Sequence, residues 1–120
     1  MQSFTLNALA LAVKDKSNLV LGSKLLDERN FEGAKQVLDR VRLTGPFSNR
    51  ALLGSGWADA FRNRFERALV PWSILVTRQV TDPSVQEAML AVPYAYGKLN
   101  VHSKAALLYG SALERFSTEI

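Results

Sequence analysis

Residues 31–34 read Phe31-Glu32-Gly33-Ala34, and the same pattern returns 34 residues later as Phe65-Glu66-Arg67-Ala68. Gly22 returns at that spacing as Gly56. A sequence that matches itself at a fixed period is typical of a chain built from stacked copies of one supersecondary unit. The stretch from Asn30 to Ala68, which joins the two copies, therefore predicts a repeat architecture.

The residues around this stretch have apolar side chains at helical spacing. Ala34, Leu38 and Val41 share one face of a helix that follows Asn30, and an asparagine at that place can cap the helix. No segment alternates apolar and polar residues convincingly over six positions, so strands are not expected. The predicted fold class is all-α.

Turn residues divide the chain into three helix pairs. Gly45-Pro46 ends the first pair, Ser48 or Asn49 caps the next helix, and Asp82-Pro83 caps the third pair. We expect helices at about 18–28 and 31–43, 50–62 and 65–78, and 84–98 and 101–116. Pro71 should bend the fourth of these helices, and Pro93 should interrupt the fifth.

The 120 residues are expected to form a single domain, residues 1–120. Within this domain, the helix pairs occupy residues 15–46, 47–82 and 83–117. The apolar residues at about 4–14 form either a separate N-terminal helix or the beginning of the next helix. A cleaved signal is not the preferred interpretation, because no positive residue precedes the apolar run. No run reaches the roughly 18–20 apolar residues of a membrane span.

The composition argues against catalytic and metal chemistry. Cysteine is absent, which excludes disulfides, thiolate metal sites and a cysteine nucleophile. His102 is the only histidine, and it aligns with Phe31 and Phe65, which predicts a packing role. No metalloprotease or phosphate-loop motif occurs. We therefore expect no enzyme activity and no cofactor or metal.

Basic charge is concentrated in the middle of the chain. Residues 40–78 hold seven arginines and two acidic residues, whereas the rest of the chain holds eight basic and nine acidic residues. Arginines can neutralise nucleic-acid phosphates. Because no aromatic residues alternate with them as a stacking platform, weak nucleic-acid binding through the arginine-rich middle repeat is the least favoured functional alternative.

The 34-residue period and its residues resemble the tetratricopeptide repeat, whose pattern runs W-x2-L-G-x2-Y, then A-x3-F, then P. The matching residues are Leu21, Gly22, Leu25, Ala34, Leu38 and Pro46; Gly56, Ala68, Trp72 and Pro83; and Val92, Tyr96, Ala105 and Tyr109. Ser55 and Asp59 depart from the pattern, and Pro93 stands where a small residue belongs. The resemblance covers about residues 15–117. It implies a right-handed α-α superhelix, a solenoid of three helix pairs plus an N-terminal helix, with Phe65 and Trp72 in packing positions.

The segments Gly45–Gly54, Ala68–Trp72 and Ala91–Ala95 also resemble uncharacterised, longer bacterial proteins that carry many such repeats. This resemblance implies a piece from near the C-terminal end of such a protein, with an exported, periplasmic parent. The sequence itself leaves the cytoplasmic and periplasmic compartments open.

In proteins with this repeat, the first helix of each pair lines a concave groove. Carried onto this sequence, the groove has an aliphatic and aromatic floor with charges at its ends: Lys16, Leu19, Ser23, Leu26, Asp27, Arg50, Leu53, Trp57, Ala60, Phe61, Glu87, Leu90, Tyr94, Gly97 and Lys98. Exposed aromatic anchors supply most of the binding energy when a helix lies in such a groove. The expected partner-binding residues are Leu19, Ser23, Arg50, Leu53, Trp57, Phe61, Leu90, Tyr94 and Lys98.

The predicted function is therefore a non-catalytic protein-protein interaction module that binds a peptide or helix of a protein partner. The alternative is a structural spacer or self-association unit, including a homo-oligomer. In that case flanking repeats, the N-terminal helix or a second copy would cover the same side chains.

Overall fold

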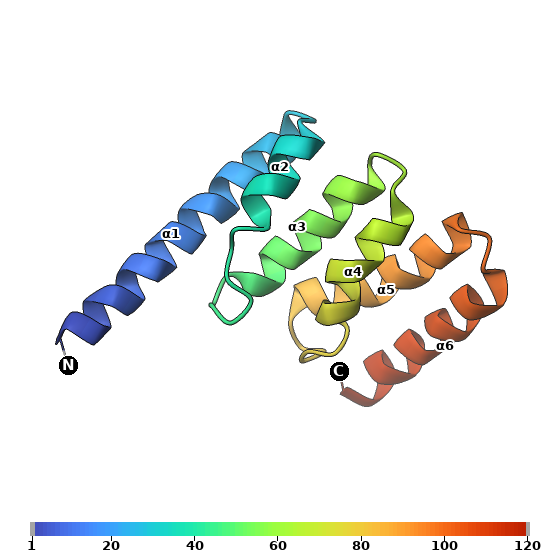
Figure 1. The fold of residues 1–120 in the computed structure, drawn as a ribbon. Coiled ribbons are helices and arrows are strands. Elements are labelled where there is room, and N and C mark those ends of the chain that lie inside the picture. The colour runs from blue at the N-terminus through green and yellow to red at the C-terminus, as the bar shows by residue number, and fades with distance from the viewer. Residues whose placement is uncertain (1, 120) are drawn as a thin grey trace.

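The computed structural model describes residues 2–119 and shows a row of six α-helices (Figure 1). They are α1 (Gln2–Asp27), α2 (Phe31–Leu38), α3 (Ser48–Ala60), α4 (Phe65–Leu75), α5 (Pro83–Lys98) and α6 (His102–Glu119). Each helix packs against the next, and α3 also packs against α1 and α5. The described residues contain no strand, so the prediction of an all-α fold is confirmed.

The three turns that join α1 to α2, α3 to α4 and α5 to α6 have the same backbone conformation. Arg29, Asn63 and Asn100 are left-handed, with φ of 63°, 59° and 65°. Each donates its N–H to the carbonyl three positions earlier, and the next residue donates to the carbonyl five positions earlier. This is the hydrogen-bond pattern of a Schellman motif. The three residues are 34 and 37 positions apart, so the sequence period is also present in the backbone.

Side chains cap α2 and α5 as the sequence predicts. Asn30 Oδ1 accepts a hydrogen bond from the Gly33 N–H at 3.0 Å, and Asp82 Oδ1 accepts one from the Ser84 N–H at 2.8 Å. Pro83 occupies the first position of α5. These bonds satisfy N–H groups that have no partner inside the helix.

The predicted cap of α3 is wrong. Phe47 precedes the helix and makes no side-chain cap, and Ser48 is already the first helical residue. The side chains of Ser48 and Asn49 instead accept hydrogen bonds from Arg78 Nη1, at 2.8 and 2.6 Å. Both are therefore used to attach the start of α3 to the loop that follows α4.

The structure corrects several predicted helix boundaries. Of the two possibilities for residues at about 4–14, the structure shows the second: they are not a separate helix but the first half of α1, which extends beyond α2 in Figure 1. Lys14-Asp15-Lys16 does not end the helix, because Asp15 faces inward while both lysines are exposed. α2 and α4 end at Leu38 and Leu75, earlier than predicted, and α5 continues through Pro93. Over residues 2–119, none of the helices combines the length and apolarity that membrane crossing requires.

Glycines in the first helices let large side chains of the second helices pack closely. The space where a Cβ of Gly22 would stand is filled by Leu38, and the corresponding space at Gly56 is filled by the Trp72 indole. A methyl group at either glycine would overlap its neighbour. This close approach explains why both helices tolerate a residue that destabilises helix interiors.

The third helix pair lacks this arrangement. Pro93 and Tyr109 stand at the positions equivalent to Gly56 and Trp72. Pro93 is buried, and Tyr109 is 44% exposed. The third pair therefore has no glycine at the position where Gly56 admits the Trp72 indole.

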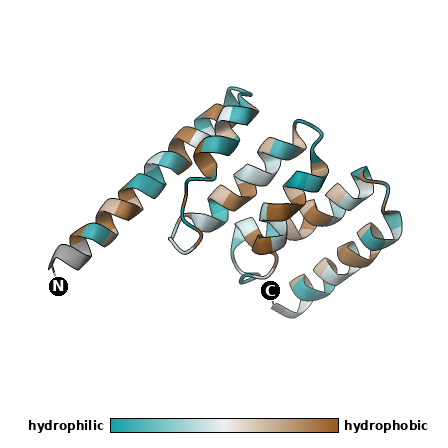
Figure 2. Ribbon diagram, in the orientation of Figure 1, coloured by the Kyte–Doolittle hydropathy of each residue, from teal (hydrophilic) through white to brown (hydrophobic). Residues whose placement is uncertain are grey.

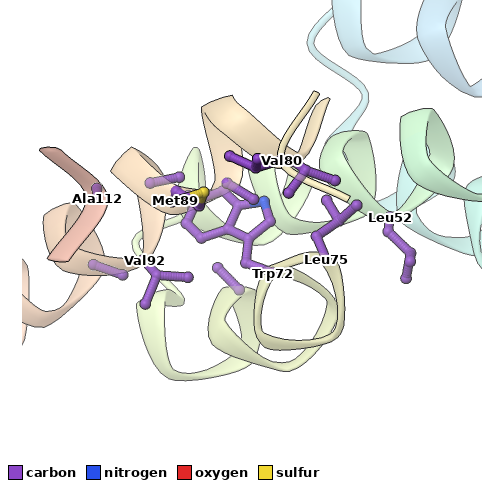
Figure 3. Close-up of a cluster of buried hydrophobic side chains, with 13 residues drawn as sticks. Leu52, Trp72, Leu75, Val80, Met89, Val92 and Ala112 are labelled. Atoms are coloured by element: carbon purple, nitrogen blue, oxygen red, sulfur yellow. The ribbon is translucent and has the colours of Figure 1, made fainter. Parts of the chain in front are cut away.

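Trp72 lies in the larger of two hydrophobic clusters (Figure 3). It is fully buried, and its Nε1–H donates to the backbone carbonyl of Leu53 at 3.2 Å. The cluster joins α3, α4 and α5 and reaches Ala112 of α6. A smaller cluster of Leu19, Leu38, Val41 and Ala51 joins α1, α2 and the start of α3. The predicted core position of Trp72 is confirmed, whereas Phe65 is half-buried at the edge of the larger cluster.

A polar network connects α2 to α3. Lys35 Nζ donates to Ser55 Oγ at 2.8 Å and lies 2.8 Å from Oδ2 of Asp59, a carboxylate that is buried. Ser55 Oγ donates in turn to Asp39 Oδ1 at 2.7 Å. Ser55 and Asp59, which depart from the repeat pattern in the second copy, are both polar partners of Lys35. A buried carboxylate requires such a counter-charge.

A second ion pair fixes the middle of α1. Asp15 is buried, and its Oδ2 accepts a hydrogen bond from Arg42 Nε at 2.7 Å. Its Oδ1 accepts another from the backbone N–H of Arg42 at 3.2 Å. These two bonds hold the loop after α2 against α1.

Candidate interaction site

Aromatic side chains from three helix pairs form one connected group. The Trp57 ring stacks on Phe61 with centroids 5.4 Å apart, and Phe61 lies 5.2 Å from Phe31. On the other side, Trp57 lies 6.4 Å from Tyr94, which meets the edge of Phe65 at 5.9 Å. Trp57 also contacts the buried Trp72, with ring centroids 4.8 Å apart. The group therefore extends from the core to the surface.

Part of this group borders a hollow of about 590 Å³. Its walls come from the end of α1, the turn that joins α1 to α2, the start of α2, the end of α3 and the first half of α5. We call it the aromatic hollow, and its residues are Leu26, Asp27, Arg29, Phe31, Trp57, Phe61 and Glu87. Phe61 is 55% exposed, and Trp57 is half-buried. The hollow thus presents aromatic faces to solvent.

Charged groups surround these rings. The Trp57 Nε1–H donates to Glu87 Oε2 at 2.6 Å, which fixes the indole across the gap between α3 and α5. The Arg29 guanidinium lies 5.4 Å from the Phe31 ring centroid. With Asp27 beside them, these groups provide both donors and acceptors at the edge of an apolar floor. Such a combination can orient a peptide whose apolar side chain enters the hollow.

The structure brings together part of the predicted groove. Trp57, Phe61, Leu26, Asp27 and Glu87 all line the aromatic hollow. Tyr94 contacts Trp57, and Lys98 lies over the Tyr94 ring at 5.6 Å. Leu90 is exposed between Glu87 and Tyr94 on the same face of α5, at the three- and four-residue spacing that places side chains side by side.

Other predicted groove residues lie elsewhere. Leu19 is 2% exposed in the smaller hydrophobic cluster, so it is a core residue and its assignment to the groove is wrong. Leu53 is half-buried against the larger cluster, and Ala60 is buried. Ser23 and Arg50 are exposed but do not line the hollow. Arg50 is eleven residues before Phe61, which is about 16 Å along a helix.

Two residues of the hollow are missed by the sequence prediction. The repeat pattern places Phe31 in a packing position, and it gives no role to Arg29, which lies in a turn. Both face the hollow because the left-handed conformation of Arg29 reverses the chain there. Arg29 follows the end of a predicted groove helix in the sequence, and this position could have identified it as a residue of the hollow.

His102 does not occupy the expected packing position. It is exposed at the first position of α6 and borders a shallow depression with Lys98 and Tyr109. Across residues 2–119 the side chains of histidine, aspartate and glutamate nowhere gather in a group of three that could hold a metal ion.

The arginines of the middle repeat have several different environments. Arg42 pairs with Asp15, and Arg78 binds Ser48 and Asn49. Arg62, Arg64 and Arg67 line a separate hollow of about 370 Å³ that also contains Glu32 and Asp59 and is lined by no aromatic residue. This arrangement lacks the uniform positive surface and the stacking rings typical of single-strand binding.

Comparison of this chain with protein-family models, with curated proteins and with solved structures finds no match.

Proposed function

We propose that this chain is a non-catalytic protein-interaction module that binds a peptide or helix of a protein partner at the aromatic hollow. The observation that carries the proposal is the exposure of Phe61 and the half-exposure of Trp57 around a hollow of about 590 Å³. Clustered aromatic side chains that remain accessible in a folded protein are typical of interaction sites.

The proposal includes the repeat architecture. Three helix pairs with equivalent left-handed turns at spacings of 34 and 37 residues support a tetratricopeptide-like solenoid with right-handed superhelical stacking. The glycine contacts at Gly22 and Gly56 support the same arrangement. In it, α1, α3 and α5 contribute one continuous surface, and the aromatic hollow is a concave part of that surface in which aromatic and charged side chains lie together.

The shape and chemistry of the hollow indicate the kind of segment it accepts. One large aliphatic or aromatic side chain would enter between Phe31, Trp57 and Phe61. Flanking polar groups of the segment would meet Asp27, Arg29 and Glu87. Removing the exposed face of Phe61 from water would supply much of the gain in free energy, because aromatic anchors dominate such contacts.

A peptide library displayed on phage provides the test, because it samples many different segments at once and the natural partner need not be identified first. Selected peptides should share a bulky apolar residue and should change the fluorescence of Trp57. Phe61→Ala should weaken their binding by about 30-fold, the size expected for an anchor worth about 2 kcal/mol. Val70→Ala is the matched control, because Val70 is an exposed apolar residue on α4 outside the hollow.

The proposal fails if no peptide is selected, or if Phe61→Ala and Val70→Ala weaken binding equally. Circular dichroism of both variants must show wild-type helicity. That result is expected because both side chains are largely exposed in the folded protein.

A further inference from the structure

The last helix exposes apolar side chains at positions that are covered in the middle of the molecule. Tyr109 and Leu113 of α6 are 44% and 67% exposed. Their equivalents are Trp72 on α4, which packs against Gly56 and Trp57 of α3, and Val76, which directly follows α4; both belong to the larger cluster, which also contains residues of α5. Figure 2 shows the apolar bands along α6. Within the described residues, no helix covers this face of α6 as α5 covers α4.

The first helix also exposes an apolar residue, on the face where the other first helices contact the preceding helix pair. Leu21 of α1 is 46% exposed, whereas its equivalents Ser55 on α3 and Val92 on α5 are buried. Ser55 meets α2 through Lys35 and Asp39, and Val92 lies in the cluster that α4 and α5 share. Leu21 therefore occupies the position that, in the other pairs, contacts the preceding helix pair.

The junction between α2 and α3 shows which residues would meet if the series continued. Leu38 and Leu43 line one side of a hollow there, and Ser48 and Ser55 line the other. Shifting each residue by the repeat spacing gives the corresponding residues at the two ends of the chain. Leu38 and Ser55 shift to Tyr109 on α6 and Leu21 on α1. Leu43, in the loop after α2, and Ser48, the first residue of α3, shift to Glu114 and Lys14, which both lie inside helices.

We propose that a second copy of this chain stacks on the first, with its α1 packed on the α6 of the first copy. The contact continues the established α2–α3 and α4–α5 interfaces. It brings Tyr109 and Leu113 against Leu21, and it places Glu114 of one copy beside Lys14 of the next. The opposite charges at the edge of an apolar contact set the direction of the stack.

This interface is heterologous, because the two copies use different surfaces. A heterologous contact leaves one free end on each side, so it produces rings or open chains instead of a closed symmetric pair. The stacking uses other residues than the aromatic hollow, so either proposal can fail without the other.

Sedimentation velocity of the whole 120-residue chain tests the stacking. The weight-average mass should rise above 13.3 kDa as the concentration increases from micromolar to millimolar. Leu113→Lys blocks the α6 end and Leu21→Lys blocks the α1 end, so each variant alone should remain a monomer. An equimolar mixture should form a discrete dimer, because each variant keeps one intact end.

Leu107→Lys is the matched control. Leu107 is the most exposed of the large apolar residues on α6, but its equivalent on α4, Val70, is also exposed within the stack. A side chain that remains exposed where two helix pairs already pack together does not belong to the contact between pairs. Leu107→Lys should therefore associate like the wild-type chain.

A second pair of variants uses charges that are exposed in the monomer and do not affect the core. Lys14→Glu and Glu114→Lys should each weaken association, and a mixture of the two should restore it. A wild-type chain that stays monomeric at millimolar concentration would overturn the proposal. The proposal would also be overturned if Leu113→Lys still associates. The same holds if the mixture of Leu113→Lys and Leu21→Lys stays monomeric while both variants keep wild-type helicity.

Discussion

The same substitution at two glycines should have opposite effects on stability. Gly56 lies in the middle of α3 against the fully buried Trp72, and a Cβ there would overlap the indole. Gly110 lies in the middle of α6, and a Cβ built on it has no atom within 4 Å. Comparing Gly56→Ala with Gly110→Ala thus separates two effects on stability, the close packing around a glycine and the low helix propensity of glycine.

The magnitudes follow from two terms. Replacing a helical glycine by alanine stabilises a helix by about 1 kcal/mol. At Gly110 this is the whole effect. At Gly56 the methyl group must displace an indole that is held by Trp57 and by the Leu53 carbonyl, which we place at roughly 2–3 kcal/mol of overpacking. Gly56→Ala should therefore lose about 1–2 kcal/mol, and Gly110→Ala should gain about 1 kcal/mol.

Urea denaturation of dilute protein, followed by circular dichroism, measures both effects. With a slope of about 2 kcal/mol per molar urea, the midpoint should fall by about 0.5–1 M for Gly56→Ala and rise by about 0.5 M for Gly110→Ala. Near-ultraviolet dichroism should change only for Gly56→Ala, because only there does a tryptophan move. Equal stabilisation by the two substitutions would refute the contact between Gly56 and Trp72.

Three further substitutions test other parts of the fold by the same denaturation assay. Trp72→Ala should cost about 3–5 kcal/mol because it leaves a cavity in the core; a near-neutral effect would contradict its burial. Arg29→Gly should stabilise by roughly 0.5–1 kcal/mol, since glycine adopts the left-handed conformation without strain; a loss would show that the contact of Arg29 with the Phe31 ring matters more. Arg42→Ala should cost about 3 kcal/mol because the buried Asp15 loses its counter-charge; an effect below 1 kcal/mol would mean that water reaches the carboxylate.

The sequence predicts the parts of the fold that depend on side-chain size. Gly22 and Gly56 are needed for close packing, and Ala34 and Ala68 are fully buried, so the period of 34 is visible in their identities. Trp72 can be assigned to the core because it follows Gly56 by the same sixteen positions as Leu38 follows Gly22. In each such pair the glycine must stay small and the partner must stay large, so the sequence alone reveals both residues.

The parts that sequence reasoning misses depend on how neighbouring pairs contact one another. The place of Leu19 on a first helix predicts a groove residue, but the packing of α1 against both α2 and α3 buries it. Arg29 cannot be recognised as left-handed from the sequence, because arginine has no preference for that conformation. Asp15 stands between two lysines in the sequence, and only the fold places Arg42 of a distant loop beside it.

The equivalent turns at Arg29, Asn63 and Asn100 also bear on how the protein folds and opens. Each turn closes a helix pair through short-range hydrogen bonds, so any of the three pairs can form before the others. Contacts between pairs link each pair to its immediate neighbours, as in a one-dimensional chain of coupled units. The middle pair is held from both sides, and each outer pair from one side. Opening should therefore start at α1–α2 or at α5–α6, and hydrogen-exchange measurements should find that the amides of α3 exchange with solvent last.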